Sequence, residues 1–256
     1  MIRPMTTQFS RRALLTTTGI GAVSLFLAAC NEKAETKAEV PAAPSAETTA
    51  AVPKAAEPAK PALPVKAAAA KEAEATVDVA KLMEQGALKD IAIGKDDAKV
   101  TIIEYASMTC PHCRQFHEAT LPEITKKYFD TGKARLILRE FPFDPRAAAA
   151  FMLARCSAQD KHYAMISVLF QQQDVWARAD DAQAALLQIA RLAGFSQESF
   201  TACLTNQKLL DDVNAVRERG TKEFGVESTP TFFINGKKYS GALSVEEMSA
   251  IIDSML

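Results

Sequence analysis

The sequence lacks an excess of charge of either sign. Its 30 Lys and Arg residues nearly balance its 31 Asp and Glu residues, and the formal net charge is -1. Composition therefore gives no electrostatic reason to expect nucleic acid as a partner. No internal repeat of a domain-like period is present in the sequence either. Of the 256 residues, 48% are apolar, so the chain is long enough and apolar enough to bury a sizeable core.

Residues 31–78 lack aromatic side chains altogether. This segment consists mainly of Ala, Pro, Glu, Lys and Thr, and it contains half of the chain's 12 prolines. Such a composition offers too little apolar area to offset the entropy that is lost when the chain becomes ordered. We therefore expect a disordered tether over residues 31–78, followed by a globular domain over residues 79–256.

The first 30 residues show the pattern of an export signal. Basic residues, among them Arg11 and Arg12, precede a largely apolar run over residues 13–29. The stretch SRRALL resembles a twin-arginine signal, and LAAC, which ends at Cys30, resembles a bacterial lipobox. The run falls short of the ~20 apolar residues that span a bilayer, which disfavours the alternative of an uncleaved transmembrane anchor. We expect a lipidated Cys30 and a mature chain outside the cytoplasm.

The apolar patterning of residues 79–256 predicts alternating strands and helices. KVTIIEYAS and ARLILREFP have the composition of buried strands, and a capping box that opens at Ser244 marks the start of the last helix. In chain order, the pattern predicts a strand over 99–107, a helix over 113–129 kinked at Pro122, a strand over 134–142, a helical block over about 144–224, and a hairpin that turns at Asn235 and Gly236 before the last helix.

The chain has only five cysteines, an odd number. Setting Cys30 aside for lipidation leaves an even set, which suits an oxidising compartment. This set consists of Cys110, Cys113, Cys156 and Cys203.

The stretch TCPHCRQFH, residues 109–117, contains two of these cysteines and two histidines. It lacks the histidine that haem attachment requires directly after the second cysteine. Cys110, Cys113 and His117 could supply three zinc ligands, but a structural site usually has a second ligand pair, and the chain offers none. A purely structural disulfide that closed so short a loop would remove little entropy from the unfolded chain. The spacing therefore favours a redox-active dithiol.

The position of Cys110, where a strand gives way to a helix, suits thiolate chemistry. Its sulfur can accept hydrogen bonds from the free N–H groups of the first helical turn and lies at the positive end of the helix dipole. Pro111 fits the first helical position, and His112 can add a donor or a positive charge beside the sulfur. A stabilised thiolate favours the reduced dithiol, which makes the oxidised protein a strong oxidant.

CPHC after a strand, with STPTFFINGKKYSG far downstream and a helical block between them, resembles the DsbA family of thiol:disulfide oxidoreductases. The resemblance implies an α/β protein with a thioredoxin-like fold and an inserted helical domain. It also implies that Cys110 is the exposed nucleophile and Cys113 the buried resolving cysteine, with Pro111 and His112 as the intervening dipeptide. No cofactor is expected.

The resemblance extends to residues outside the CPHC motif. It implies that Glu104 is a buried acid that relays the proton of the resolving thiol, although a surface glutamate is the simpler alternative. It implies that Pro230 is a cis-proline facing the dithiol and that Thr229 presents backbone groups to an extended substrate. The best-known oxidase of the family has valine before this proline, so Thr229 leaves the direction of the reaction open. For His117 we expect a packing or surface role.

A second disulfide between Cys156 and Cys203 resembles that of some relatives in the family and would be structural. The alternative is a pair of buried free thiols. Either way, these two cysteines lie in the predicted helical block and not in the CPHC motif.

Taken together, these features predict a periplasmic, membrane-anchored lipoprotein that introduces disulfides into exported proteins with cysteine thiols. A membrane oxidant of the DsbB kind is expected to reoxidise it. One alternative is a disulfide isomerase or reductase. Thr229 favours this alternative, whereas the linker disfavours it, because the linker has no amphipathic pattern that would build a dimer or trimer. Another is a metal-binding lipoprotein that uses Cys110, Cys113 and His117.

Overall fold

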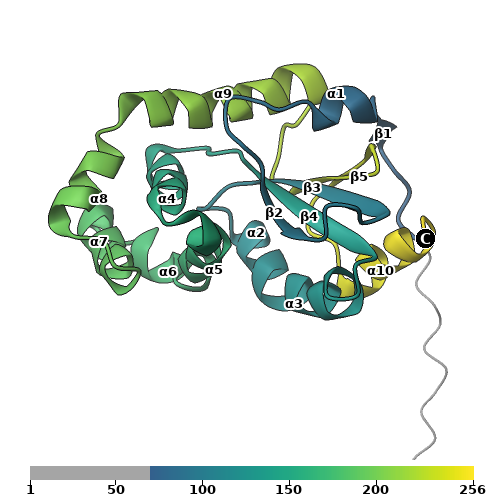
Figure 1. Cartoon of the computed structure of the whole chain (residues 1–256), viewed down its shortest axis with the longest axis horizontal. Coiled ribbons are helices and arrows are strands. Elements are labelled where there is room, and N and C mark those ends of the chain that lie inside the picture. The colour runs from purple at the N-terminus through teal and green to yellow at the C-terminus, as the bar shows by residue number, and fades with distance from the viewer. Residues whose placement is uncertain (1–69) are drawn as a thin grey trace, which may run out of the picture. The chain divides into compact units, whose positions relative to one another are not determined.

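The computed structural model describes residues 70–256, which form helices packed on a central mixed sheet of six strands (Figure 1). The strands, in the order β1-β6-β5-β3-β4-β2 across the sheet, are β1 (Ala75–Thr76), β2 (Ile91–Gly94), β3 (Val100–Ala106), β4 (Ala134–Glu140), β5 (Thr231–Ile234) and β6 (Lys237–Ser240). The helices are α1 (Val79–Met83), α2 (Pro111–Gln115), α3 (Leu121–Ile124), α4 (Pro145–Cys156), α5 (His162–Gln171), α6 (Gln173–Trp176), α7 (Ala182–Leu192), α8 (Gln197–Leu204), α9 (Gln207–Phe224) and α10 (Val245–Asp253). The predicted α/β class is confirmed.

β3 and β4 lie side by side in the interior of the sheet and pair in parallel, whereas the other pairs in the sheet are antiparallel. Each has seven residues, of which all but one are buried. Strands buried on both faces are rich in apolar residues, as VTIIEYA and ARLILRE are, which is why the sequence predicts these two. The hairpin between β5 and β6 turns at Asn235 and Gly236, which both have positive φ.

The helix that follows CPHC is continuous but irregular. Two π-helical turns, η1 (Phe116–Thr120) and η2 (Thr125–Phe129), interrupt it on either side of α3. Pro122 has no N–H, so it cannot donate to the carbonyl four residues earlier. The wider turn η1 directly precedes it, with the N–H of Leu121 donating to Phe116 O. The irregularity therefore lies where the sequence predicts a kink.

The described residues include a segment that precedes residue 79, the predicted start of the domain. β1 pairs with β6, and the Glu74 carboxylate accepts from the N–H and the hydroxyl of Ser240. Strands this short carry no apolar pattern, so the sequence does not predict β1. The predicted signal segment over 1–30 and the tether up to residue 69 lie outside the described residues.

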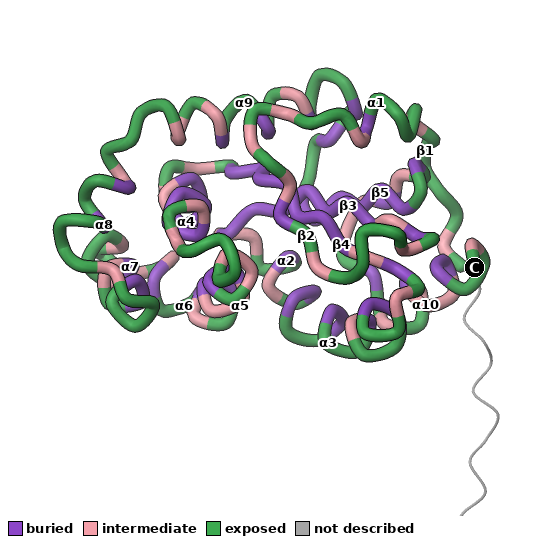
Figure 2. Tube along the Cα trace, viewed as in Figure 1, coloured by how far each residue is buried: buried purple, intermediate pink, exposed green. Residues whose placement is uncertain are grey.

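Three apolar clusters hold the helices to the sheet, and the interior strands β3, β4 and β5 are almost continuously buried (Figure 2). α10 and the helix after CPHC cover one face, whereas α1 and α9 cover the other (Figure 1). α9 comes so close to the sheet that a Cβ at Gly220 would lie 2.7 Å from a ring carbon of Tyr105. Glycine is therefore required at this crossing.

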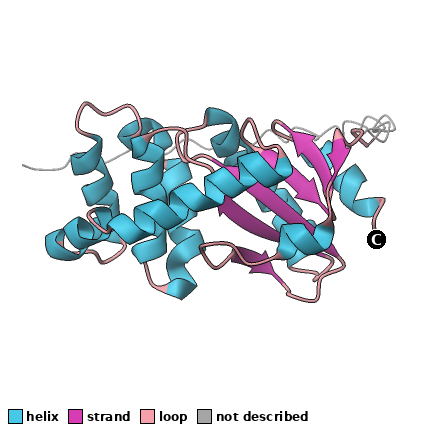
Figure 3. Cartoon of the chain, turned by 90° about the horizontal axis from the view of Figure 1, so that it is seen from above, coloured by secondary structure: helices cyan, strands magenta, loops and turns pink. Residues whose placement is uncertain are grey.

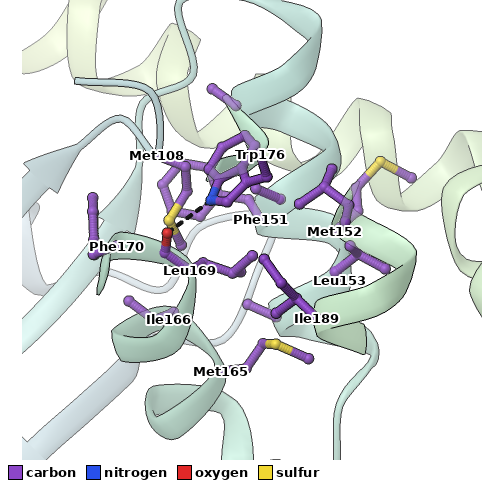
Figure 4. Close-up of a cluster of buried hydrophobic side chains, with 14 of the residues drawn as sticks. Met108, Phe151, Met152, Leu153, Met165, Ile166, Leu169, Phe170, Trp176 and Ile189 are labelled. Carbon is purple, nitrogen blue, oxygen red and sulfur yellow. Dashed lines mark hydrogen bonds between the residues drawn. The ribbon is translucent and has the colours of Figure 1, made fainter. Parts of the chain in front are cut away.

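Helices α4 to α8 gather beside the sheet, and α9 leads back from them (Figure 1 and Figure 3). Their core surrounds Trp176, which is fully buried and donates from its indole N–H to Leu169 O at 2.8 Å (Figure 4). Met108, from the loop before CPHC, lies in this same cluster, so the core of the helical block reaches the dithiol loop (Figure 4). Cys156 of α4 and Cys203 of α8 form a disulfide. Among residues 70–256, no helix combines the length and apolarity needed to cross a membrane.

Candidate active site

Cys110 and Cys113 stand at the start of α2, directly beyond the end of β3. Cys110 is the N-cap residue, with extended backbone angles, and Pro111 occupies the first helical turn. Cys110 is half-buried, whereas Cys113, one turn further into the helix, is completely buried. Both are free thiols in this structure. The exposed end of the motif is therefore Cys110.

The surroundings of Cys110 favour its thiolate. They lower the pKa of this thiol from an ordinary 9.0 to about 5. The largest cause is a hydrogen bond from the Cys113 thiol, followed by Thr229 and by the backbone N–H groups of Cys113 and His112, while burial opposes them. A cysteine with this pKa is ionised at neutral pH and can act as a nucleophile or a leaving group.

Cys113 has the opposite environment. Burial raises its pKa well above the ordinary value, and the charges of Glu104 and of the Cys110 thiolate raise it further. The two thiols therefore differ in both access and ionisation: at neutral pH one is a thiolate at the surface, and the other keeps its proton in the core.

Thr229 and Pro230 face the dithiol from the loop before β5. The peptide bond that joins them is cis. The Cys110 thiol donates to Thr229 O at 3.2 Å. The Thr229 hydroxyl is buried and has no hydrogen-bond partner among the described residues. Once Cys110 has lost its proton, this hydroxyl is a donor available to the thiolate.

Glu104 lies on β3 with its side chain completely buried, not on the surface. Its Oε2 is 2.9 Å from Nε2 of His117, and the side chain of His117 is only 3% exposed. His117 is thus buried in contact with an acid, and the surface role considered for it from the sequence is excluded. His112 is exposed, and its ring makes no hydrogen bond within the described chain. Its contribution to the site is its backbone N–H.

Two residues of the site were missed by sequence reasoning. Gln173 of α6 is buried, and its amide donates to Met108 O at 2.8 Å and to Cys110 O at 3.0 Å. Asp144, the N-cap of α4, accepts from the Thr109 hydroxyl at 2.6 Å. Both lie far from CPHC in the sequence, and nothing in their local patterns connects them with it. They fix the dithiol loop to the helical block.

A surface groove of about 520 Å³ opens beside the dithiol loop. Thr109 and Pro111 line it from the dithiol side, Asp144 lines it from the start of α4, and Gln173, Asp174 and Arg178 line it from α6 and the loop beyond. Asp174 also forms an ion pair with Arg114 of α2 across this region. Thr109 and Pro111, the sequence neighbours of Cys110, place the groove next to the dithiol.

The geometry gives no support to the alternative of a metal site. In the part of the chain that the structure describes, no group of three or more His, Cys, Asp or Glu side chains is placed to hold a metal ion. Cys110, Cys113 and His117 are therefore not gathered into the tetrahedral arrangement considered from the sequence. Instead, His117 turns its Nε2 to Glu104.

A dithiol of this kind, at the junction of a strand and a helix and facing a cis-proline, defines the class of thioredoxin-fold dithiol proteins. A family model described as thioredoxin matches residues 87–254. The chain belongs to the DsbA family of thiol:disulfide oxidoreductases. The thioredoxin-like fold expected from the sequence is thereby confirmed.

Three relatives illustrate the similarity. A protein-disulfide oxidoreductase of Rickettsia conorii is 33% identical over 168 residues, which are 65% of this chain and 60% of the relative. The crystal structure of Wolbachia pipientis alpha-DsbA1 is 31% identical with a TM-score of 0.63, covering 68% of this chain and 94% of that chain. Disulfide bond formation protein D of Bacillus anthracis is 28% identical over 152 residues, 57% of this chain and 69% of the relative. The chain spans less than two thirds of the length of the Rickettsia protein.

Proposed function

We propose that this protein introduces disulfides into exported proteins, outside the cytoplasm, by exchange at Cys110 and Cys113. The observation that carries the proposal is the contrast between two thiols one helical turn apart. The pKa of Cys110 is lowered to about 5, whereas the pKa of Cys113 is raised well above its ordinary value. Such a pair stabilises the reduced dithiol, so the oxidised pair gives up its disulfide readily. The names of the Rickettsia and Bacillus relatives agree with this chemistry.

The exchange proceeds in two steps. A substrate thiolate attacks Cys110 Sγ, the bond to Cys113 breaks, and Cys113 leaves with the electron pair. A second substrate thiolate then attacks the substrate sulfur of the mixed disulfide, and Cys110 leaves as a thiolate. The substrate is oxidised and the dithiol is reduced by two electrons. The low pKa of Cys110 makes it a good leaving group in the second step.

Other residues of the site assist these steps. Glu104 relays a proton to and from Cys113, whose pKa its charge raises. Thr229, which precedes cis-Pro230, brings backbone groups to the side of Cys110, where an extended polypeptide can pair with them. Substrates are therefore exported proteins with cysteine thiols. A DsbB-like membrane oxidant restores the disulfide, and lipidated Cys30 holds the protein at the membrane of the periplasm.

The equilibrium of the dithiol with glutathione at pH 7 tests the direction of the reaction. Because the pKa of Cys110 is lowered from 9.0 to about 5, stabilisation of the reduced form is lost as the pH falls through 5 and is complete above 9. At pH 7 we expect a reduction potential more oxidising than about -180 mV. A potential near about -270 mV would instead support a reductase and overturn the oxidase direction.

The proposed membrane anchor predicts a separate result. Changing Cys30 to Ser removes the thiol that the lipid modifies, so we expect the protein to leave the membrane fraction or to lack the lipid. The dithiol of the purified variant should react as before, because Cys30 takes no part in the exchange. Membrane fractionation and the mass of the mature protein measure the outcome. Retention of unlipidated Cys30→Ser protein in the membrane would favour a transmembrane anchor.

A further inference from the structure

Glu104 is a fully buried carboxylate, and only one of its two oxygens has a hydrogen-bond partner within the described chain. Glu104 is flanked on the sheet by Leu138 of β4 and Phe232 of β5, which are both apolar. Its Oε2 contacts His117, but its Oε1 has no hydrogen-bond partner among residues 70–256. A fully buried, ionised carboxylate with a free oxygen is costly. The free oxygen therefore indicates a place where a proton comes and goes.

The imidazole of His117 is held in one orientation by aromatic rings. It stacks on Phe170 of α5 with 4.1 Å between ring centroids, and it meets Phe116 edge-on at 5.5 Å. These contacts fix the plane of the ring, so that Nε2 stays directed at Glu104. Imidazole is also the side chain that exchanges protons near neutral pH. His117 thus has the position and the chemistry to share a proton with the carboxylate.

Few other titratable groups face this pair. From α2 there is the Cys113 thiol, whose pKa the charge of Glu104 raises. From α5 there is Tyr163, whose ring stacks beside His117 at 6.4 Å between centroids. Burial and the charge of Glu104 raise the pKa of Tyr163 well above its ordinary value, so it stays neutral. In the described range, no lysine or arginine forms an ion pair with Glu104. Its single basic partner there is the imidazole.

We propose that His117 and Glu104 share a proton, and that this proton passes to Cys113 when the disulfide opens and returns when it closes. The inference rests on the proposed dithiol exchange and adds a positioning residue to it. When substrate attacks Cys110, the electron pair of the broken bond stays on Cys113 Sγ. The shared proton moves through Oε1 to that sulfur. Glu104 is then a carboxylate, and neutral His117 donates from Nε2–H to Oε2.

The reverse transfer occurs on reoxidation. After Cys110 has formed a mixed disulfide with the oxidant, Cys113 must lose its proton before it can attack Cys110 Sγ. The proton returns through Oε1 to the space between Glu104 and His117. The buried thiol therefore needs no direct contact with solvent in either direction.

The rate at which excess dithiothreitol opens the disulfide, measured against pH, tests this role. After correction for the attacking thiolate, we expect the rate to fall by about 10-fold as the shared proton is lost, because Cys113 then leaves without an acid. His117→Gln keeps a donor at Glu104 but cannot take up a proton. Its rate should be about 10-fold lower below neutral pH and lack the step in the profile. The matched control is His162→Gln, since His162 contacts only Ser157 O among hydrogen-bond partners in the described chain and should behave as wild type.

A measurement on the unaltered protein guards against a variant that fails to fold. The chain has only three histidines, so the imidazole NMR signals are few, and His162→Gln helps to assign them. We expect the imidazole nitrogen shifts of His117 to differ between the oxidised and reduced proteins, because the proposed proton transfer couples its hydrogen bond with Glu104 to Cys113. Identical His117 shifts in both states, or a rate profile of His117→Gln that parallels wild type at every pH, would overturn the proposal. A reductase-like potential would leave both tests valid, because the proton moves in either direction of exchange.

Discussion

Changing Cys110 to Ser is expected to reduce disulfide exchange to background, whereas changing Cys113 to Ser is expected to stop exchange after its first step. Cys110 is half-buried at the start of α2 and has a pKa of about 5, so it is the sulfur that a substrate meets. Cys113 is completely buried and keeps its proton. Without Cys113, a mixed disulfide at Cys110 cannot be resolved from within the protein.

The two variants therefore differ in the covalent complexes that they form. Incubated with a protein substrate that carries a disulfide, reduced Cys113→Ser should accumulate a mixed disulfide, which a non-reducing gel and mass spectrometry detect. Cys110→Ser serves as the matched control and should accumulate almost none. Equal trapping by both variants would show that the buried thiol is also accessible, contrary to the structure.

Removing the second disulfide is expected to lower the free energy of unfolding by about 4 kcal/mol. Cys156 and Cys203 are 47 residues apart in the sequence, and their bond joins α4 to α8. In the chain-entropy model, opening a loop of this size raises the conformational entropy of the unfolded chain and so lowers its free energy by about 4 kcal/mol. The dithiol lies at α2, outside this loop, so its reactivity should persist in the double variant Cys156→Ala, Cys203→Ala.

Urea unfolding of the oxidised proteins measures this effect, with the slope of the free energy against urea checked for a change in the unfolded state. The Cys110–Cys113 disulfide must be intact in both proteins, so that only the second bond differs. A loss below about 1 kcal/mol would show that packing in the helical block, around Trp176, already holds α4 and α8 together.

The parts of the fold that the sequence predicts are those with a strong local signal. β3 and β4 are rich in apolar and β-branched residues because they are buried on both faces. The capping box at Ser244 and Glu247 closes as the pattern indicates, with Ser244 Oγ accepting from the Glu247 N–H at 3.1 Å. The position of Cys110 at a helix start also follows from local order, since strand and helix meet there.

The parts that could not be predicted depend on contacts between distant segments. β1 and β2 are short strands at the two edges of the sheet, and pairing with β6 and β4 defines them more than their own sequence does. Gln173 reaches Cys110 O only because α6 packs beside the dithiol loop. The contact between Glu104 and His117 could not be predicted either, because His117 lies in a π-helical turn that sets the direction of its side chain. Local patterns contain none of this information.

The ionisation of the thiols in the reduced protein tests the central claim most directly. The thiolate absorbance in the ultraviolet, followed against pH with the alkylation of each cysteine read by mass spectrometry, separates the two sulfurs. The structure predicts that Cys110 becomes a thiolate with a midpoint at about pH 5, while Cys113 stays protonated and unalkylated at neutral pH. A midpoint for Cys110 near the ordinary value of 9.0, or equal alkylation of both thiols at neutral pH, would contradict it.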